Sequence, residues 1–147
     1  MLAVRTLFDT SVIVAAFEVS HPRHIVCLPW LQQAQTEQIQ GFIATHTLAE
    51  VYSVLTRLPV RPRISPELAQ RLITENLERF EVIPLTTEDY QMVVAQMVNL
   101  NLTGGGIYDA LIAQAAVKAE VNTLLTLNPN HFNRLGEDIA RLVQVPQ

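Results

Sequence analysis

The stretch VRTLFDTSVIVAAF, residues 4–17, decides the fold class of this chain. Its first five residues are rich in β-branched and apolar side chains, which is typical of a short strand. Asp9 follows them directly, and residues 10–17 continue as a short helix. A strand that passes straight into a helix is the repeating unit of α/β folds.

The same alternation of short apolar runs and longer helical segments continues along the chain. Further strands are predicted at residues 41–45, 81–85 and 123–127, with 142–145 as a candidate fifth strand. Helices are predicted at residues 22–38, 47–58, 65–80, 86–100 and 107–120, and the fourth of these begins with capping-box residues. This order predicts an α/β fold with a mostly parallel sheet, and right-handed crossovers place helices on both of its faces. Pro84 predicts an edge position or a strand end for the run 81–85.

The length and composition of the chain bound the classes of protein to which it can belong. With 147 residues and no linker, repeat or low-complexity tract, it is expected to form one domain over residues 1–147. Apolar residues make up 49% and charged residues 16% of the sequence, which excludes disorder as a description of the whole chain. No apolar run is long enough to span a membrane. The low charge fraction leaves much apolar surface to cover, which favours a homo-oligomer or a permanent partner.

The net charge and the number of cysteines exclude further classes of function for this protein. A net charge of −4 argues against a basic protein that binds nucleic acid by neutralising many phosphates. An enzyme that meets phosphates through a metal ion stays open, because the metal supplies positive charge locally. The single cysteine, Cys27, excludes an intramolecular disulfide and a cysteine-rich zinc site. The N-terminal residues lack the charged and long apolar regions of a signal peptide, so a reduced, cytoplasmic protein is expected.

Four oxygen-bearing side chains are predicted at junctions between strands and helices. Asp9 follows the first strand, Glu50 lies in the first turns of the helix after the second strand, Asp109 lies in the first turn of a later helix, and Asn128 follows the strand 123–127. Because ligands of such sheets bind beyond the carboxyl ends of the strands, we expect these side chains to converge. Converging carboxylates repel one another unless a cation is present, and Mg²⁺ and Mn²⁺ prefer oxygen ligands. The pattern therefore indicates a metal site that could activate water and neutralise a phosphate.

Each acidic residue also has a purely structural explanation. Asp9 could cap the helix that follows it, Glu50 could be a solvated helix residue, and Asp109 could interact with the dipole of its helix. For any one of these acidic residues alone, the structural explanation is favoured. Because three acidic residues stand at three predicted strand-to-helix junctions, we favour a shared metal site over three separate structural roles.

Four short motifs around these residues resemble the successive motifs of the PIN-domain family, and within it the VapC-type toxins. The motifs are FDTSVI at 8–13, TLAEV at 47–51, YDALIA at 108–113 and LTLNPNHF at 125–132. They stand in the family's order and cover nearly the whole chain. The resemblance implies a parallel five-stranded sheet flanked by helices. It also implies a Mg²⁺- or Mn²⁺-dependent endoribonuclease that cleaves single-stranded RNA as the toxin of a toxin–antitoxin pair, forms homodimers and is blocked by a cognate antitoxin.

The resemblance also implies a role for each of these residues. Asp9, Glu50 and Asp109 match the three central acidic positions that hold the metal, and Asn128 stands where the family often has a fourth aspartate. The missing charge at Asn128 leaves open whether one or two metal ions bind, although its carbonyl oxygen can still ligate a metal or orient water. Ser11 matches a small hydroxyl position near the metal, or it caps the short helix that begins there.

Two other functions fit parts of the pattern. A PIN-fold module with a weakened site would bind RNA or an antitoxin without cleavage, and the missing charge at Asn128 favours this alternative. A phosphatase of the haloacid-dehalogenase type shares an aspartate after the first strand, but it needs a second aspartate at the position that Ser11 occupies. We therefore favour the metal-dependent ribonuclease, with the non-cleaving module as the alternative.

Overall fold

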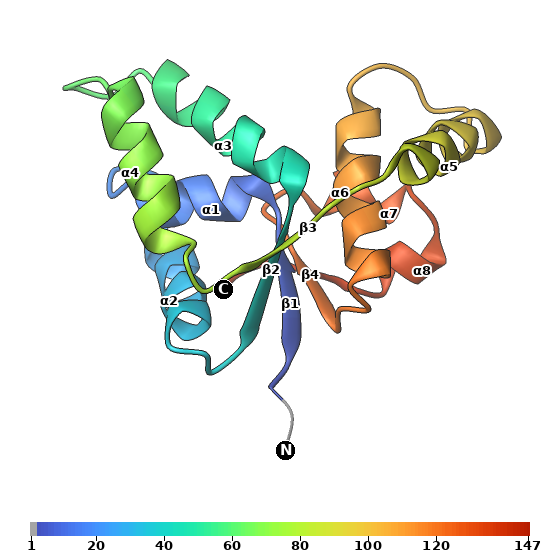
Figure 1. The fold of residues 1–147 in the computed structure, drawn as a ribbon, viewed down its shortest axis with the longest axis horizontal. Coiled ribbons are helices and arrows are strands. Elements are labelled where there is room, and N and C mark those ends of the chain that lie inside the picture. The colour runs from blue at the N-terminus through green and yellow to red at the C-terminus, as the bar shows by residue number, and fades with distance from the viewer. Residues whose placement is uncertain (1–2) are drawn as a thin grey trace.

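The computed structural model describes residues 3–147 and contains a five-stranded sheet in which every neighbouring pair of strands is parallel (Figure 1). The strands are β1 (Arg5–Phe8), β2 (Gln40–Ala44), β3 (Glu81–Ile83), β4 (Thr123–Leu125) and β5 (Val143–Gln144). Their order across the sheet is β3-β2-β1-β4-β5, so β1 is central and β3 lies at an edge. The predicted parallel α/β fold is confirmed, and so is the edge position that Pro84 indicates.

Helices connect the strands and cover both faces of the sheet (Figure 1). They are α1 (Thr10–Phe17), α2 (His24–Gln35), α3 (Thr45–Arg57), α4 (Pro66–Asn76), α5 (Thr87–Asn99), α6 (Gly106–Lys118), α7 (Pro129–Asn133) and α8 (Glu137–Ala140). Helices α1 to α4 gather on one side, and α5 to α8 gather on the other. Across residues 3–147, none of them combines the length and apolar character that crossing a membrane requires.

Two hydrophobic cores follow from the alternation of side chains along the central strands. Leu7 and Leu124 pack into the core beneath α5 to α8. Their neighbours Phe8 and Leu125 point to the opposite face and pack into the core beneath α1 to α4. All four side chains are fully buried. Burial on both faces explains why the strands are continuous apolar runs in the sequence.

Helix α5 begins with the capping box that the sequence predicts. The Thr86 hydroxyl accepts a hydrogen bond from the Asp89 backbone N–H (3.2 Å), and the Asp89 carboxylate accepts one from the Thr86 backbone N–H (2.7 Å). Lys118 Nζ lies 2.8 Å from Asp89 Oδ2 and holds the pKa of that carboxyl well below its usual range. Asp89 therefore joins α5 to α6 and has a structural role.

The structure corrects some element boundaries and adds two short helices. Helix α2 is shorter at both ends than the predicted 22–38. Helix α4 ends at Asn76, so Phe80 lies beyond the helix whose apolar face it was expected to extend; it packs edge-on against Phe8 instead, with 5.0 Å between ring centroids. Helices α7 and α8 escape sequence prediction because each is too short to show a periodic apolar pattern. Pro129 in the first turn of α7 was the available signal.

Phe132 anchors α7 to the sheet, because its side chain is fully buried in the core beneath α5 to α8. Phe132→Ala is expected to lower the free energy of unfolding by about 3–5 kcal/mol, since it leaves a cavity. Chemical denaturation measures this loss. Ile25→Ala, at an α2 position that is 84% exposed, should change the same quantity by less than about 0.5 kcal/mol. Equal losses in the two variants would contradict the packing of α7.

Candidate active site

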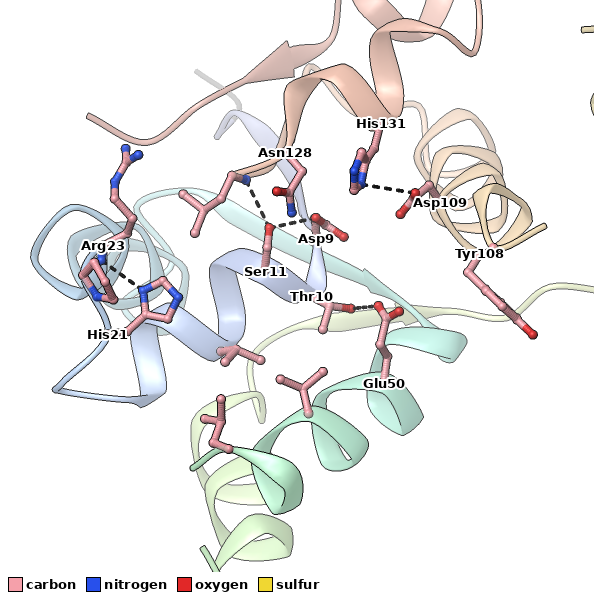
Figure 2. Close-up of a pocket in the computed structure, with 16 residues that line it drawn as sticks. Asp9, Thr10, Ser11, His21, Arg23, Glu50, Tyr108, Asp109, Asn128 and His131 are labelled. Atoms are coloured by element: carbon pink, nitrogen blue, oxygen red, sulfur yellow. Dashed lines mark hydrogen bonds and ion pairs between the residues drawn. The ribbon is translucent and has the colours of Figure 1, made fainter. Parts of the chain in front are cut away.

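A pocket of about 700 Å³ lies at the carboxyl-terminal edge of the sheet (Figure 2). Strand β1 ends immediately before Asp9, and β2 runs directly into α3, which carries Glu50. Asp109 lies in the first turn of α6, and Asn128 immediately precedes α7. All four side chains that the sequence singled out line this one pocket, although they come from four separate segments.

Asp9 is the most buried of the acidic residues, with 5% of its surface exposed. Its Oδ2 accepts hydrogen bonds from the hydroxyls of Ser11 and Thr126, both at 2.8 Å. Burial raises the pKa of Asp9, and these two hydroxyls oppose that rise because they stabilise the carboxylate. Asp9 stands at the N-cap position of α1 but makes no capping hydrogen bond with its side chain. The structure therefore does not support capping as its role.

The two hydroxyls that hold Asp9 are themselves held by the segment after β4. Ser11 Oγ accepts a hydrogen bond from the backbone N–H of Leu127 (3.1 Å), and Thr126 Oγ1 accepts one from the backbone N–H of Asn128 (2.9 Å). This network joins the start of α1 to the loop that leads into α7. It fixes the orientation of one Asp9 oxygen, as outer-sphere groups do at metal sites.

Glu50 faces the pocket from α3, with 32% of its side chain exposed. Its Oε1 accepts a hydrogen bond from the hydroxyl of Thr10. Its Oε2 lies 4.0 Å from His46 Nε2, one turn earlier in the same helix. The ring of His46 is stacked on Tyr108 of α6, with 5.1 Å between the centroids. Glu50 is thus oriented by neighbours on both α1 and α3.

Asp109 lines the same pocket from the first turn of α6, and its pKa is raised. Burial raises its pKa to about 6, and the charge of Asp9 and then that of Glu50 add to the rise. His131 Nδ1 lies 3.5 Å from Asp109 Oδ2, and Arg134 Nη2 lies 4.0 Å from the same oxygen. These two groups lower the pKa but do not cancel the rise. His131 and Arg134 therefore compensate for only part of the cost of burying a negative charge at Asp109 beside two other carboxylates.

Sequence reasoning missed three residues that contact the carboxylates of the pocket. Thr10 and Thr126 orient Glu50 and Asp9, and His131 lies beside Asp109. Thr126 falls inside the predicted strand 123–127, but β4 ends at Leu125. A threonine one residue beyond a buried strand was the signal that could have identified it. No spacing in the sequence marks Thr10 or His131, because their partners lie far away along the chain.

The donor set fits a hard divalent cation in its chemistry. Among residues 3–147, no three His, Cys, Asp or Glu side chains are close enough together to form a preassembled metal site. Asp9, Glu50 and Asp109 nevertheless face the same pocket, and the charges of Asp9 and Glu50 add to the rise that burial causes in the pKa of Asp109. Carboxylate oxygens are the ligands that Mg²⁺ and Mn²⁺ prefer, and such an ion would relieve the repulsion between these charges.

Comparisons with known proteins agree on one family. The PIN domain model matches residues 6–138. Ribonuclease VapC27 of Mycobacterium tuberculosis is 35% identical over 135 residues, which cover 90% of this chain and 93% of that protein. Ribonuclease VapC40 of the same species is 33% identical over 118 residues, which cover 80% of this chain and 82% of the relative.

Solved structures share the fold at lower identity. VapBC2 from Rickettsia felis, bound to a DNA fragment from its promoter, superposes with a TM-score of 0.69 at 20% identity, covering 98% of this chain and 100% of that one. FitAcB from Neisseria gonorrhoeae superposes with a TM-score of 0.65 at 20% identity, covering 97% and 96% of the two chains. Nearly the whole chain thus takes part in the shared fold.

Proposed function

The chain belongs to the PIN-domain family, and we propose that it is a divalent-metal-dependent endoribonuclease that cleaves single-stranded RNA. The observation that carries the proposal is the meeting of Asp9, Glu50 and Asp109 in one pocket at the carboxyl-terminal edge of the sheet. Relatives that align over most of this chain are named ribonucleases, which supports RNA as the substrate.

Asp9, Glu50 and Asp109 would hold a Mg²⁺ or Mn²⁺ ion, which when bound supplies a Lewis acid beside the scissile phosphate and lowers the pKa of water. Asp9 is the fixed member of the three, because Ser11 and Thr126 hold one of its oxygens. This orientation precedes substrate binding and lowers the cost of assembling the site.

The remaining pocket residues position the reacting groups. One of the carboxylates accepts the proton of the attacking water, and hydrolysis leaves a 3′-hydroxyl and a 5′-phosphate. Asn128 lines the same pocket and presents an amide, whose oxygen can orient water and whose nitrogen can donate to a phosphate oxygen. His131 lies beside Asp109 and places a further hydrogen-bonding group at that wall.

A cleavage assay tests this proposal against the non-cleaving alternative. The purified protein is incubated with a single-stranded RNA and with a duplex of the same sequence, in Mg²⁺, in Mn²⁺ and in EDTA. We expect cleavage that needs the cation and is faster on the single strand. RNA binding without cleavage in either cation would favour the non-cleaving module. Asn128→Asp would then test whether the charge missing at Asn128 is the reason.

We further propose that the chain is the toxin of a toxin–antitoxin pair and that its antitoxin covers the acidic pocket. A groove of about 670 Å³ between α3 and α4 supports a protein partner, because it combines apolar and polar lining residues. Leu48, Ala49 and Tyr52 line it and flank Glu50 along α3. A segment bound there would lie next to the site. We also propose that the protein acts in the cytoplasm, since its proposed substrate is RNA.

We also propose that the chain forms a homodimer through the exposed face of α5. Tyr90, Val94 and Val98 recur every four residues and therefore lie on one side of the helix, and Val98 is 73% exposed. An exposed apolar stripe of this kind is typical of an interface.

Val98→Lys is therefore expected to convert the dimer to a monomer, because it places a charge in an apolar contact. Light scattering coupled to size-exclusion chromatography measures the mass. Val19→Lys is the matched control, because Val19 is 77% exposed in the loop after α1 and should leave the dimer intact. A Val98→Lys variant that keeps the dimeric mass would contradict this interface.

A further inference from the structure

The candidate active-site pocket extends well beyond its three carboxylates. Figure 2 shows Arg23 and His21 on the opposite side of Asp9 and Ser11 from Asp109. Among the described residues that line the pocket, Arg23 is the single arginine or lysine. The pocket therefore has one strongly acidic end and one end with a permanent positive charge.

Two polar contacts position Arg23 at that end. Its Nη2 donates a hydrogen bond to the carbonyl oxygen of Pro146 (2.8 Å), and its backbone N–H donates to His21 Nδ1 (3.0 Å). No carboxylate within residues 3–147 forms an ion pair with Arg23. Its charge is not neutralised inside the chain, and the guanidinium has further N–H donors that match the oxygens of a phosphate.

Much of the remaining wall of the pocket is apolar. Val14, Val54, Leu58 and Leu127 line it; Val14 is buried and the other three are half-buried. A cation site needs no such surface. An apolar wall can instead contact the planar face of a nucleobase, and single-stranded RNA is recognised largely through contacts to its unstacked bases.

We infer that this end of the pocket binds the nucleotide next to the scissile phosphate, with Arg23 on the phosphate of that nucleotide and the apolar wall against its base. The inference rests on the proposed ribonuclease function. In an RNA strand each phosphate is joined to a ribose that carries a base, and the pocket presents an acidic cation site, an apolar wall and an arginine. Arg23 thereby positions the substrate and does not take part in bond breaking.

Steady-state cleavage of a single-stranded RNA oligonucleotide in saturating Mn²⁺, measured from 50 to 200 mM KCl, tests this inference. Arg23→Gln removes the charge and keeps a donor for Pro146. We expect KM to rise about tenfold with little change in kcat, because the lost contact binds substrate and transition state alike. The slope of log(1/KM) against log[KCl] should become shallower by about 0.7, which is the contribution of one phosphate contact on a single strand.

Two further variants separate charge from structure. Arg23→Lys keeps the charge and should keep the salt slope. Arg71→Met is the matched control, because Arg71 is an exposed arginine on α4 that lies outside the pocket, and it should leave both KM and slope unchanged. A folded Arg23→Gln variant with the wild-type KM and slope would overturn the inference while leaving the ribonuclease function standing. A wild-type protein that cleaves no RNA would overturn both.

The contact to the base has its own test. An oligonucleotide with an abasic nucleotide next to the cleaved bond should show a raised KM with the wild-type protein. The same replacement several nucleotides away should not. Equal KM values for the two oligonucleotides would overturn the assignment of the apolar wall to a base.

Discussion

Asp9→Asn should abolish RNA cleavage while leaving the protein folded. The substituted amide side chain would keep the size of the carboxylate and an oxygen that can accept from Ser11 and Thr126, but it would lose the charge that binds the cation. Loss of an outer-sphere partner at a metal site costs about 10–100-fold in activity, so loss of a direct ligand should exceed about 100-fold. Initial rates in Mn²⁺ measure the effect, and thermal melting verifies the fold. Cleavage at the wild-type rate would exclude Asp9 from the site.

The hydroxyl of Thr126 provides a graded version of the same test. Thr126→Val removes the hydrogen bond to Asp9 and should lower the cleavage rate by about 10–100-fold. Thr6→Val is the matched control, because Thr6 lies fully buried on β1 and its hydroxyl has no hydrogen-bond partner among the described residues. It should keep the wild-type rate. Equal rates for the two variants would show that the orientation of Asp9 does not matter.

The fold was largely predictable because its signals are local. The apolar run ending at Phe8 and the capping-box residues at the start of α5 are local patterns, and they placed the strands, the long helices and the parallel sheet. The two short helices were not predictable in this way. Phe132 shows the reason: it is buried through packing against distant parts of the chain, which no short sequence window contains.

The acidic residues of the candidate site could be predicted from the sequence, but the groups that contact them could not. A carboxylate directly after a strand, such as Asp9, can be located from the sequence because the edge of a parallel sheet is where ligands bind. The groups that orient and perturb it come from contacts across the fold. Thr126 lies 117 residues from Asp9 along the chain, and His131 reaches Asp109 only because α7 docks beside α6. Arg23 enters the pocket from the loop before α2 for the same reason.

Asp109→Asn should stabilise the metal-free protein above pH 6 and have little effect near pH 4. The folded protein raises the pKa of Asp109 to about 6, so between pH 4 and pH 6 the folded state binds more protons than the unfolded state. The contribution of Asp109 to the free energy of unfolding therefore falls as pH rises from 4 to 6 and stays low above pH 6. The full shift corresponds to roughly 3 kcal/mol, and partial exposure of the side chain reduces this to about 1–3 kcal/mol.

Thermal melting in EDTA at pH 5 and pH 7.5 measures this difference. The Asp109→Asn variant should melt several degrees above the wild type at pH 7.5, with a smaller gap at pH 5, since about 1 kcal/mol shifts the melting temperature by about 2–4 °C in a domain of this size. Adding Mn²⁺ should stabilise the wild type and narrow the gap. Asp138→Asn is the control, because that carboxyl is 88% exposed on α8 and should show no such pH dependence. A gap that does not change with pH would contradict the raised pKa of Asp109 in the folded protein.

The binding of Mn²⁺ to the metal-free protein tests the central claim most directly, because the account requires Asp9, Glu50 and Asp109 to act together on one cation. Isothermal titration calorimetry at pH 7.5 should show saturable binding to the wild type. The Asp9→Asn protein should bind at least about tenfold more weakly, while Asp138→Asn should bind like the wild type. Absence of binding to the folded wild type, or equal binding to the wild type and Asp9→Asn, would contradict the proposed metal site.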